Sequence, residues 1–74
     1  MNATANTATL DVSGDTLEVR WTGSVWVAPT NGSQHARIGD AMRVELEAYY
    51  LACGEDLDEH ADEIDSLLAN IQRS

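Results

Sequence analysis

Two segments in the first half of the chain alternate between apolar and polar residues. The apolar positions are Ala8, Leu10 and Val12 in residues 7–12, and Leu17, Val19 and Trp21 in residues 16–22. Alternation with a period of two places one set of side chains on one face of a strand and the other set on the opposite face. The pattern therefore predicts two strands, each with one buried face.

The turn between these strands predicts their register. Leu10 and Leu17 can share a buried face only if the connecting loop has an even number of residues. A two-residue Ser13-Gly14 loop satisfies this condition. A four-residue loop also satisfies it, but it places Asp11 opposite Glu18, and two like charges in that position repel each other. We therefore expect the two-residue turn.

A second tight turn predicts a pair of tryptophans on neighbouring strands. Glycine at the first central position, as in Gly23-Ser24, is typical of a type II′ turn. This turn places Trp21 directly opposite Trp26, so we expect a third strand over Ser24–Ala28 and a buried Trp pair. A stacking platform for bases or sugars is the alternative, which the lack of surrounding basic residues disfavours.

The chain after the third strand is less regular. Residues 29–34 are expected to form a loop with Asn31-Gly32 at its turn, and residues 35–38 are a short fourth strand or a connector. Asp40–Cys53 alternates partly like a strand. Its helix-forming composition, with Asp40 as N-cap and Gly54 as the C′ residue, favours a helix.

The predicted helix over Asp40–Cys53 carries two apolar stripes and a wetter face. The bulky stripe is Met42, Leu46, Tyr49 and Cys53, the small stripe is Ala41, Val44, Ala48, Leu51 and Ala52, and the wetter face is Arg43, Glu47 and Tyr50. Two apolar stripes imply two packing partners. We expect the bulky stripe to pack on the sheet and the small stripe on the last helix.

The segment Gly54–Ser74 predicts an acidic amphipathic helix with an apolar stripe from residue 57 to residue 71. The stripe consists of Leu57, Ala61, Ile64, Leu67, Leu68 and Ile71. Together the elements predict an α+β domain over residues 7–74, after a disordered tip at residues 1–6. Its architecture is a three-stranded antiparallel β-meander followed by a two-helix hairpin.

Chain length and cysteine content narrow the class of protein. A domain of 74 residues buries only roughly 60% of the surface that its unfolded chain exposes, so its stability is marginal. Because an apolar stripe on the last helix could be covered by a second copy of the chain, we expect a homodimer. Cys53 is the only cysteine, which excludes an intrachain disulfide. The start of the chain does not resemble a signal peptide and the longest apolar run is six residues, so we expect a cytoplasmic protein without a membrane span.

The net charge of −9 is concentrated in the second half of the chain. Residues 40–74 carry ten of the thirteen acidic residues, and the chain contains no lysine. Direct binding to nucleic acid, or to an anionic membrane, requires a basic surface that this composition does not provide. Both kinds of partner are therefore disfavoured.

No pattern in the sequence predicts catalysis, a metal site or a cofactor. A calcium-binding loop that starts at Asp56 fails, because Ala61 and Leu67 stand where glycine and a bidentate glutamate are required. His60 has Asp56 and Glu63 one turn away on either side, which is a weak set of metal ligands. Carboxylates on a solvated helix also lack an environment that would separate their pKa values for acid–base work. We therefore expect a protein that is not an enzyme.

Three interpretations of the acidic segment remain open. It is a solvating face of a protein from an acid-rich or halophilic proteome, a surface that mimics DNA phosphates and blocks a nucleic-acid-binding enzyme, or part of a helical hairpin that mediates assembly. The chain resembles, in size and charge, small phage-encoded inhibitors of restriction or CRISPR complexes.

We favour stoichiometric binding to a basic protein surface, such as that of a nucleic-acid-binding complex. The candidate contact residues are Glu55, Asp56, Asp58, Glu59, Asp62, Glu63 and Asp65, together with Arg43, Glu47 and Tyr50.

Overall fold

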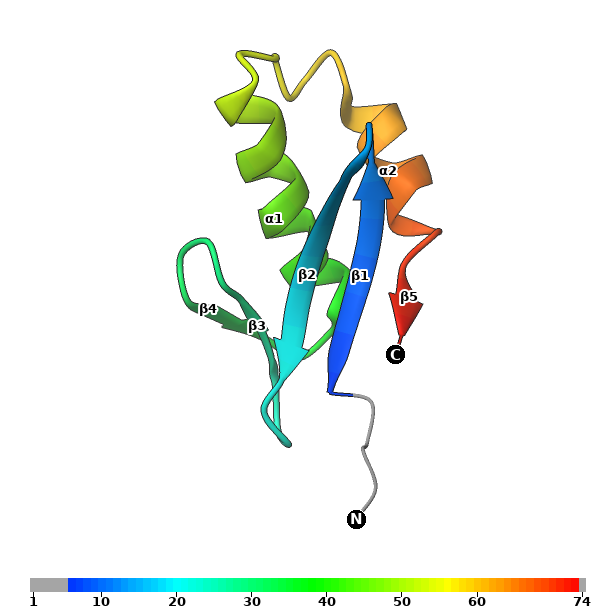
Figure 1. Cartoon of the computed structure of the whole chain (residues 1–74). Coiled ribbons are helices and arrows are strands. Elements are labelled where there is room, and N and C mark those ends of the chain that lie inside the picture. The colour runs from blue at the N-terminus through cyan, green and yellow to red at the C-terminus, as the bar shows by residue number, and fades with distance from the viewer. Residues whose placement is uncertain (1–5, 74) are drawn as a thin grey trace.

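The computed structural model describes residues 6–73 and shows an α+β domain in which two helices cover one face of an antiparallel sheet (Figure 1). The elements in chain order are β1 (Thr7–Val12), β2 (Asp15–Trp21), β3 (Trp26–Ala28), β4 (Ser33–His35), α1 (Ile38–Ala52), α2 (Ala61–Leu68) and β5 (Gln72–Arg73). The strand order in the sheet is β4-β3-β2-β1-β5. The predicted meander forms its centre, and the two outer strands are additions to the prediction.

The β1–β2 hairpin has the predicted two-residue turn. Leu10 pairs with Leu17 and Ala8 pairs with Val19. Ser13 and Gly14 both have positive φ, at 52° and 88°, as a type I′ turn requires. The ladder extends one residue beyond β1, because the amide of Trp21 donates to the carbonyl of Asn6. The rest of the tip predicted to be disordered lies outside the described residues.

The predicted cross-strand tryptophan pair is confirmed. Trp21 pairs with Trp26, and their ring centroids are 5.3 Å apart. The amide of Thr22 donates to the carbonyl of Val25 and closes a two-residue turn at Gly23-Ser24. Trp26 is only 5% exposed, so this pair belongs to the core and not to a stacking platform. The third strand begins at Trp26, two residues later than expected.

The two outer strands correct the predicted order of elements. Asn31-Gly32 lies in the turn before β4, as expected. The fourth strand begins at Ser33, two residues before the expected 35–38 segment, and Ile38 already belongs to α1. At the other edge, β5 pairs antiparallel with β1. Arg73 of β5 stands opposite Ala8, and its guanidinium lies 5.3 Å from the ring centroid of Trp26.

The ends of α1 differ in how well the sequence predicted them. Asp40 lies in the first turn and is not the N-cap, which is Arg37. The carboxyl end is as expected, since Gly54 has φ of 80°. Its amide donates to the carbonyl of Leu51 at 3.0 Å, and the amide of Glu55 donates to that of Tyr50 at 2.9 Å. These two bonds form a Schellman motif, which ends the helix.

One buried face, and not two stripes, connects α1 to the rest of the molecule. Its buried residues are Ala41, Met42, Glu45, Leu46 and Tyr50. The expected second stripe is wrong at its carboxyl end, where Leu51 is 60% exposed and Ala52 is exposed. Tyr50 belongs to the core cluster and packs against the ring of His60, whereas Leu51 stays uncovered. Tyr50 was expected on the wetter face, but it is only 6% exposed.

The acidic helix is much shorter than predicted, because α2 has eight residues and residues 57–60 form a turn before it. The carboxylate of Asp56 accepts a hydrogen bond from the amide of Asp58 at 2.9 Å. Aspartate side chains that bond the backbone two residues on compete with helix formation. Five of the six predicted apolar positions still reach the core: Ile64 is buried, and Leu57, Leu67, Leu68 and Ile71 are partly buried against it. Ala61 is exposed, so its place in the predicted stripe is wrong. Within residues 6–73, no helix has the length and apolar character needed to cross a membrane.

Candidate functional site: the acidic segment and the His60 cleft

The seven predicted carboxylates form one exposed region, which we call the acidic surface. Glu55, Asp56, Asp58 and Glu59 lie on the segment between the helices, and Asp62, Glu63 and Asp65 lie on α2. All seven residues are exposed. The predicted regular spacing along one helix is therefore wrong for the first four, since a helix begins only at Ala61.

Three of these carboxylates have a basic partner within the molecule, and two of the three share one histidine. Arg43 of α1 forms an ion pair with Asp65 of α2, which ties the two helices together. His60 contacts both Glu55 and Glu63. The remaining four carboxylates, those of Asp56, Asp58, Glu59 and Asp62, form no ion pair with any residue of the described chain.

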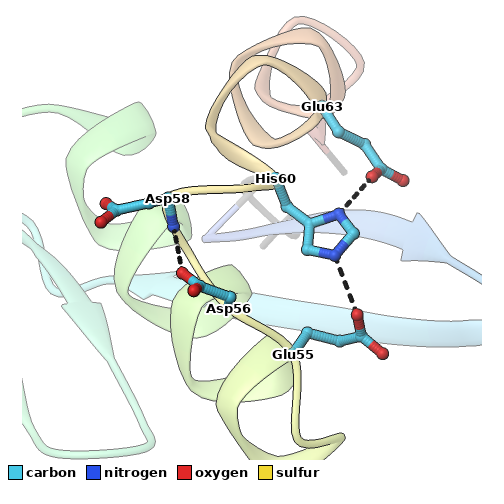
Figure 2. A network of polar contacts seen from close by, with 5 residues as sticks. All are labelled: Glu55, Asp56, Asp58, His60 and Glu63. Atoms are coloured by element: carbon cyan, nitrogen blue, oxygen red, sulfur yellow. Dashed lines mark hydrogen bonds and ion pairs between the residues drawn. The ribbon is translucent and has the colours of Figure 1, made fainter.

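His60 lies between two carboxylates from different parts of the chain (Figure 2). Its Nδ1 is 2.9 Å from Oε1 of Glu63, and its Nε2 is 2.8 Å from Oε1 of Glu55. The hydrogen bond with Glu63 and then that with Glu55 raise the pKa of His60 above its usual value of 6.5, against a smaller opposing effect of burial. The site therefore favours the imidazolium form.

A cleft of about 250 Å³ opens beside His60, between the β1–β2 turn, the carboxyl end of α1 and the start of α2. Its lining includes Val12, Ser13, Tyr49, Tyr50, Cys53, Glu55, His60 and Glu63. The volume is below the roughly 300–1,000 Å³ typical of sites for small organic ligands. The cleft can therefore hold a side chain or a few water molecules more readily than a cofactor.

Two tyrosines form the wall of the cleft on α1. The Tyr49 hydroxyl donates to Oδ2 of Asp15 at 3.0 Å, and this bond, followed by burial, raises the pKa of Tyr49. The ring of Tyr50 lies 5.1 Å from the ring of His60. Burial, followed by the hydrogen-bonding carboxylate of Glu63, raises the pKa of Tyr50. Both phenols therefore stay protonated at neutral pH and serve as hydrogen-bond donors.

The sequence did not predict which carboxylates contact His60. A helix through this segment would place Asp56 and Glu63 beside the ring, but Asp56 bonds the amide of Asp58 and Glu55 contacts the ring instead. The Glu55–His60 spacing brings the two side chains together only because the segment between them is not helical. In residues 6–73, no three His, Cys, Asp or Glu side chains are grouped so that they could hold a metal ion.

The three candidate contact residues of α1 differ in accessibility. Arg43 is partly exposed and pairs with Asp65, so it borders the acidic surface. Glu47 is partly buried on α1. Tyr50 lies under His60 and lines the cleft, so only the part of its side chain that faces the cleft is available to a partner.

Comparison of the chain with protein-family models, with curated proteins and with solved structures finds no match.

Proposed function

We propose that this protein is not an enzyme and acts by stoichiometric binding of its acidic surface to a basic surface of another protein. The observation that carries the proposal is the set of four exposed carboxylates without an ion pair, Asp56, Asp58, Glu59 and Asp62. No lysine or arginine lies between Glu55 and Asp65. A negative surface of this kind speeds the encounter with a positive one and rejects negative partners.

The partner class that fits best is a cytoplasmic nucleic-acid-binding enzyme or complex, because its binding channel has the complementary charge. Nucleic-acid channels are lined by lysine and arginine placed to meet phosphates. The acidic surface would occupy such a channel as a DNA mimic and block it, as a phage-type anti-restriction or anti-CRISPR-like inhibitor. The mimicry rests on the density of carboxylates on a folded segment and not on a helical repeat.

A second candidate function is assembly through a homodimer, and one observation favours it. Leu51 on α1 is 60% exposed, which is more than any other large apolar side chain of the described residues. In that case the acidic surface only keeps the protein soluble. Sedimentation of the wild type and of Leu51→Glu over a range of concentrations distinguishes the two, because only a dimer that uses Leu51 would dissociate on this substitution.

A capture experiment with matched charge variants tests the binding proposal. The test variant Asp58→Asn, Glu59→Gln, Asp62→Asn removes three charges from the acidic surface and retains the turn made by Asp56. The control Asp11→Asn, Glu18→Gln, Asp40→Asn removes three charges elsewhere. We expect wild type and control to retain basic proteins from a host lysate, and to release them as salt rises from about 0.1 M to about 1 M.

The two variants also define the failure of the proposal. Equal capture by the test variant would show that these carboxylates are only a solvating face. Equal loss in both variants would show that total charge, and not this surface, holds the partner.

A further inference from the structure

Three parts of the chain meet at His60. Glu55 follows the end of α1, Glu63 lies on α2, and the ring of Tyr50 packs from within α1. Both ring nitrogens of His60 lie within 2.9 Å of a carboxylate oxygen. A neutral imidazole carries one N–H and can donate only once, whereas the imidazolium donates twice. With both carboxylates ionised, the two contacts are both hydrogen bonds only when the ring is charged.

We infer that His60 is a pH-sensitive latch, which holds the acidic segment against both helices when the imidazole is charged and releases one carboxylate when it is neutral. The latch itself stands on the geometry of these two contacts. Its effect on partner binding rests on the proposed function.

Among residues 6–73, the lining of the cleft beside His60 includes no lysine or arginine that could replace its charge. The ionisable groups that face the ring are Glu55 from the connecting segment, Glu63 from α2, and Tyr49, Tyr50 and Cys53 from α1, with Asp15 of the hairpin behind Tyr49. Loss of the proton therefore leaves a lone pair facing one carboxylate and two negative charges on either side of a neutral ring. Both changes favour movement of one of the two carboxylates away from the ring.

The direction of the pH effect follows from the raised pKa of His60, whose largest cause is the hydrogen bond with Glu63. The stabilisation from the latch is fully present below the unfolded value of 6.5 and is lost as pH rises through the higher folded value. The latch is thus closed in mildly acidic solution and opens as pH rises through the raised pKa of His60. Opening adds one net negative charge to the acidic surface, so binding to a basic partner should strengthen as pH rises.

Nuclear magnetic resonance of the protein alone tests the latch, with the ring nitrogens of His60 and the backbone amides as reporters. The amide of His60 donates to the carbonyl of Leu57, and that of Asp58 donates to Asp56, so both report on the order of the segment. Their protection factors, corrected for the intrinsic exchange rate, should fall about two- to fivefold as the ring deprotonates. The amide of Val19 in β2 should not change.

Four variants separate the latch from a general effect of pH. Glu55→Gln and Glu63→Gln should each lower the titration midpoint of His60. In His60→Gln, the protection of the segment amides should equal that of the deprotonated wild type at every pH. In His60→Arg, which has a fixed charge, it should equal that of the protonated wild type at every pH. A Cys53→Ser background removes the thiol from the cleft. Two results would overturn the inference. One is a decrease of amide protection with pH in His60→Gln that equals the decrease in wild type. The other is an unchanged titration midpoint of His60 in both Glu55→Gln and Glu63→Gln.

The consequence for binding is tested separately with the same variants. Capture of basic proteins should rise with pH for the wild type and should not depend on pH for His60→Arg. A latch that titrates as expected, with capture that is independent of pH, would leave the latch intact and count against the proposed function.

Discussion

At the scale of single residues, Glu45 is the buried carboxylate that connects α1 to the β3–β4 turn. It is 9% exposed, and its two oxygens accept hydrogen bonds from the amide and the hydroxyl of Thr30, both at 2.8 Å. Glu45→Ala should lower the free energy of unfolding by about 1–3 kcal/mol, because the amide and the hydroxyl of Thr30 lose a charged acceptor. Urea unfolding measures the change, and Glu47→Ala on the same helix, expected within about 0.5 kcal/mol of wild type, is the control. Equal effects of the two substitutions would show that the bonds to Thr30 contribute nothing.

Gly54 is the residue that allows α1 to end in a Schellman motif. Its φ of 80° is a conformation that other residues adopt only with strain. Gly54→Ala should therefore destabilise the domain by about 1–2 kcal/mol, although no atom would meet the added methyl group within 4 Å. Gly39→Ala, inside α1 and also unobstructed, should raise stability by about 0.4–1 kcal/mol. Thermal unfolding of both variants checks the opposite signs, and a shared sign would contradict the assignment of the strain to Gly54.

At the scale of elements, the Trp21–Trp26 pair holds the β2–β3 hairpin in register. The tilted rings, with 49° between their planes, should give a coupled signal in near-ultraviolet circular dichroism. This signal should disappear in either Trp→Ala variant. Trp26→Ala should also cost about 3–5 kcal/mol because Trp26 is buried, and Trp21→Ala should cost less because Trp21 is partly exposed. A coupled signal that survives either substitution would mean that the signal does not come from this pair.

The sequence predicted the central hairpins well because period-two alternation and loop parity act together. A shift of one residue would turn Leu10 and Val19 to the solvent, so burial permits only one register. The helical half lacks such a constraint. The apolar period of Leu57 to Ile71 fits a long helix, but the side chain of Asp56 bonds the backbone and the chain turns instead. The strand β5 has two residues and no pattern of its own, so only its pairing with β1 reveals it.

The same distinction explains which parts of the candidate site were predictable. The acidic surface is predictable from the sequence alone, because its seven carboxylates lie close together along the chain. The cleft depends on tertiary packing, which brings Tyr50 under His60 and Glu55 to one side of the ring. Tyr50 was placed on the wrong face because an apolar ring with a polar hydroxyl suits both a wet face and a core edge.

At the scale of the whole molecule, the net charge of −9 on 74 residues makes self-repulsion a global term in stability. Added salt screens this repulsion and shortens its range, from about 30 Å at 0.01 M salt to about 3 Å at 1 M. The unfolding midpoint should therefore rise as sodium chloride is added over this range.

Variants can locate the part of this repulsion that comes from the acidic surface. Asp58→Asn, Glu59→Gln, Asp62→Asn should be more stable than wild type at low salt and should gain less from added salt, because these carboxylates form no ion pair that would be lost. The control Asp11→Asn, Glu18→Gln, Asp40→Asn removes the same charge, but two of its three sites have local partners: Asp11 accepts from Thr16 and Glu18 lies near Arg20. Asp40 and Asp62 each lie in the first turn of a helix, so the helix dipole acts alike in the two variants. Its gain at low salt should be smaller. Chemical unfolding in urea, which adds no ions, measures all three proteins at each salt concentration. Equal gains in the two variants would mean that the repulsion is spread over the molecule, and that the acidic surface is not where this charge acts most strongly.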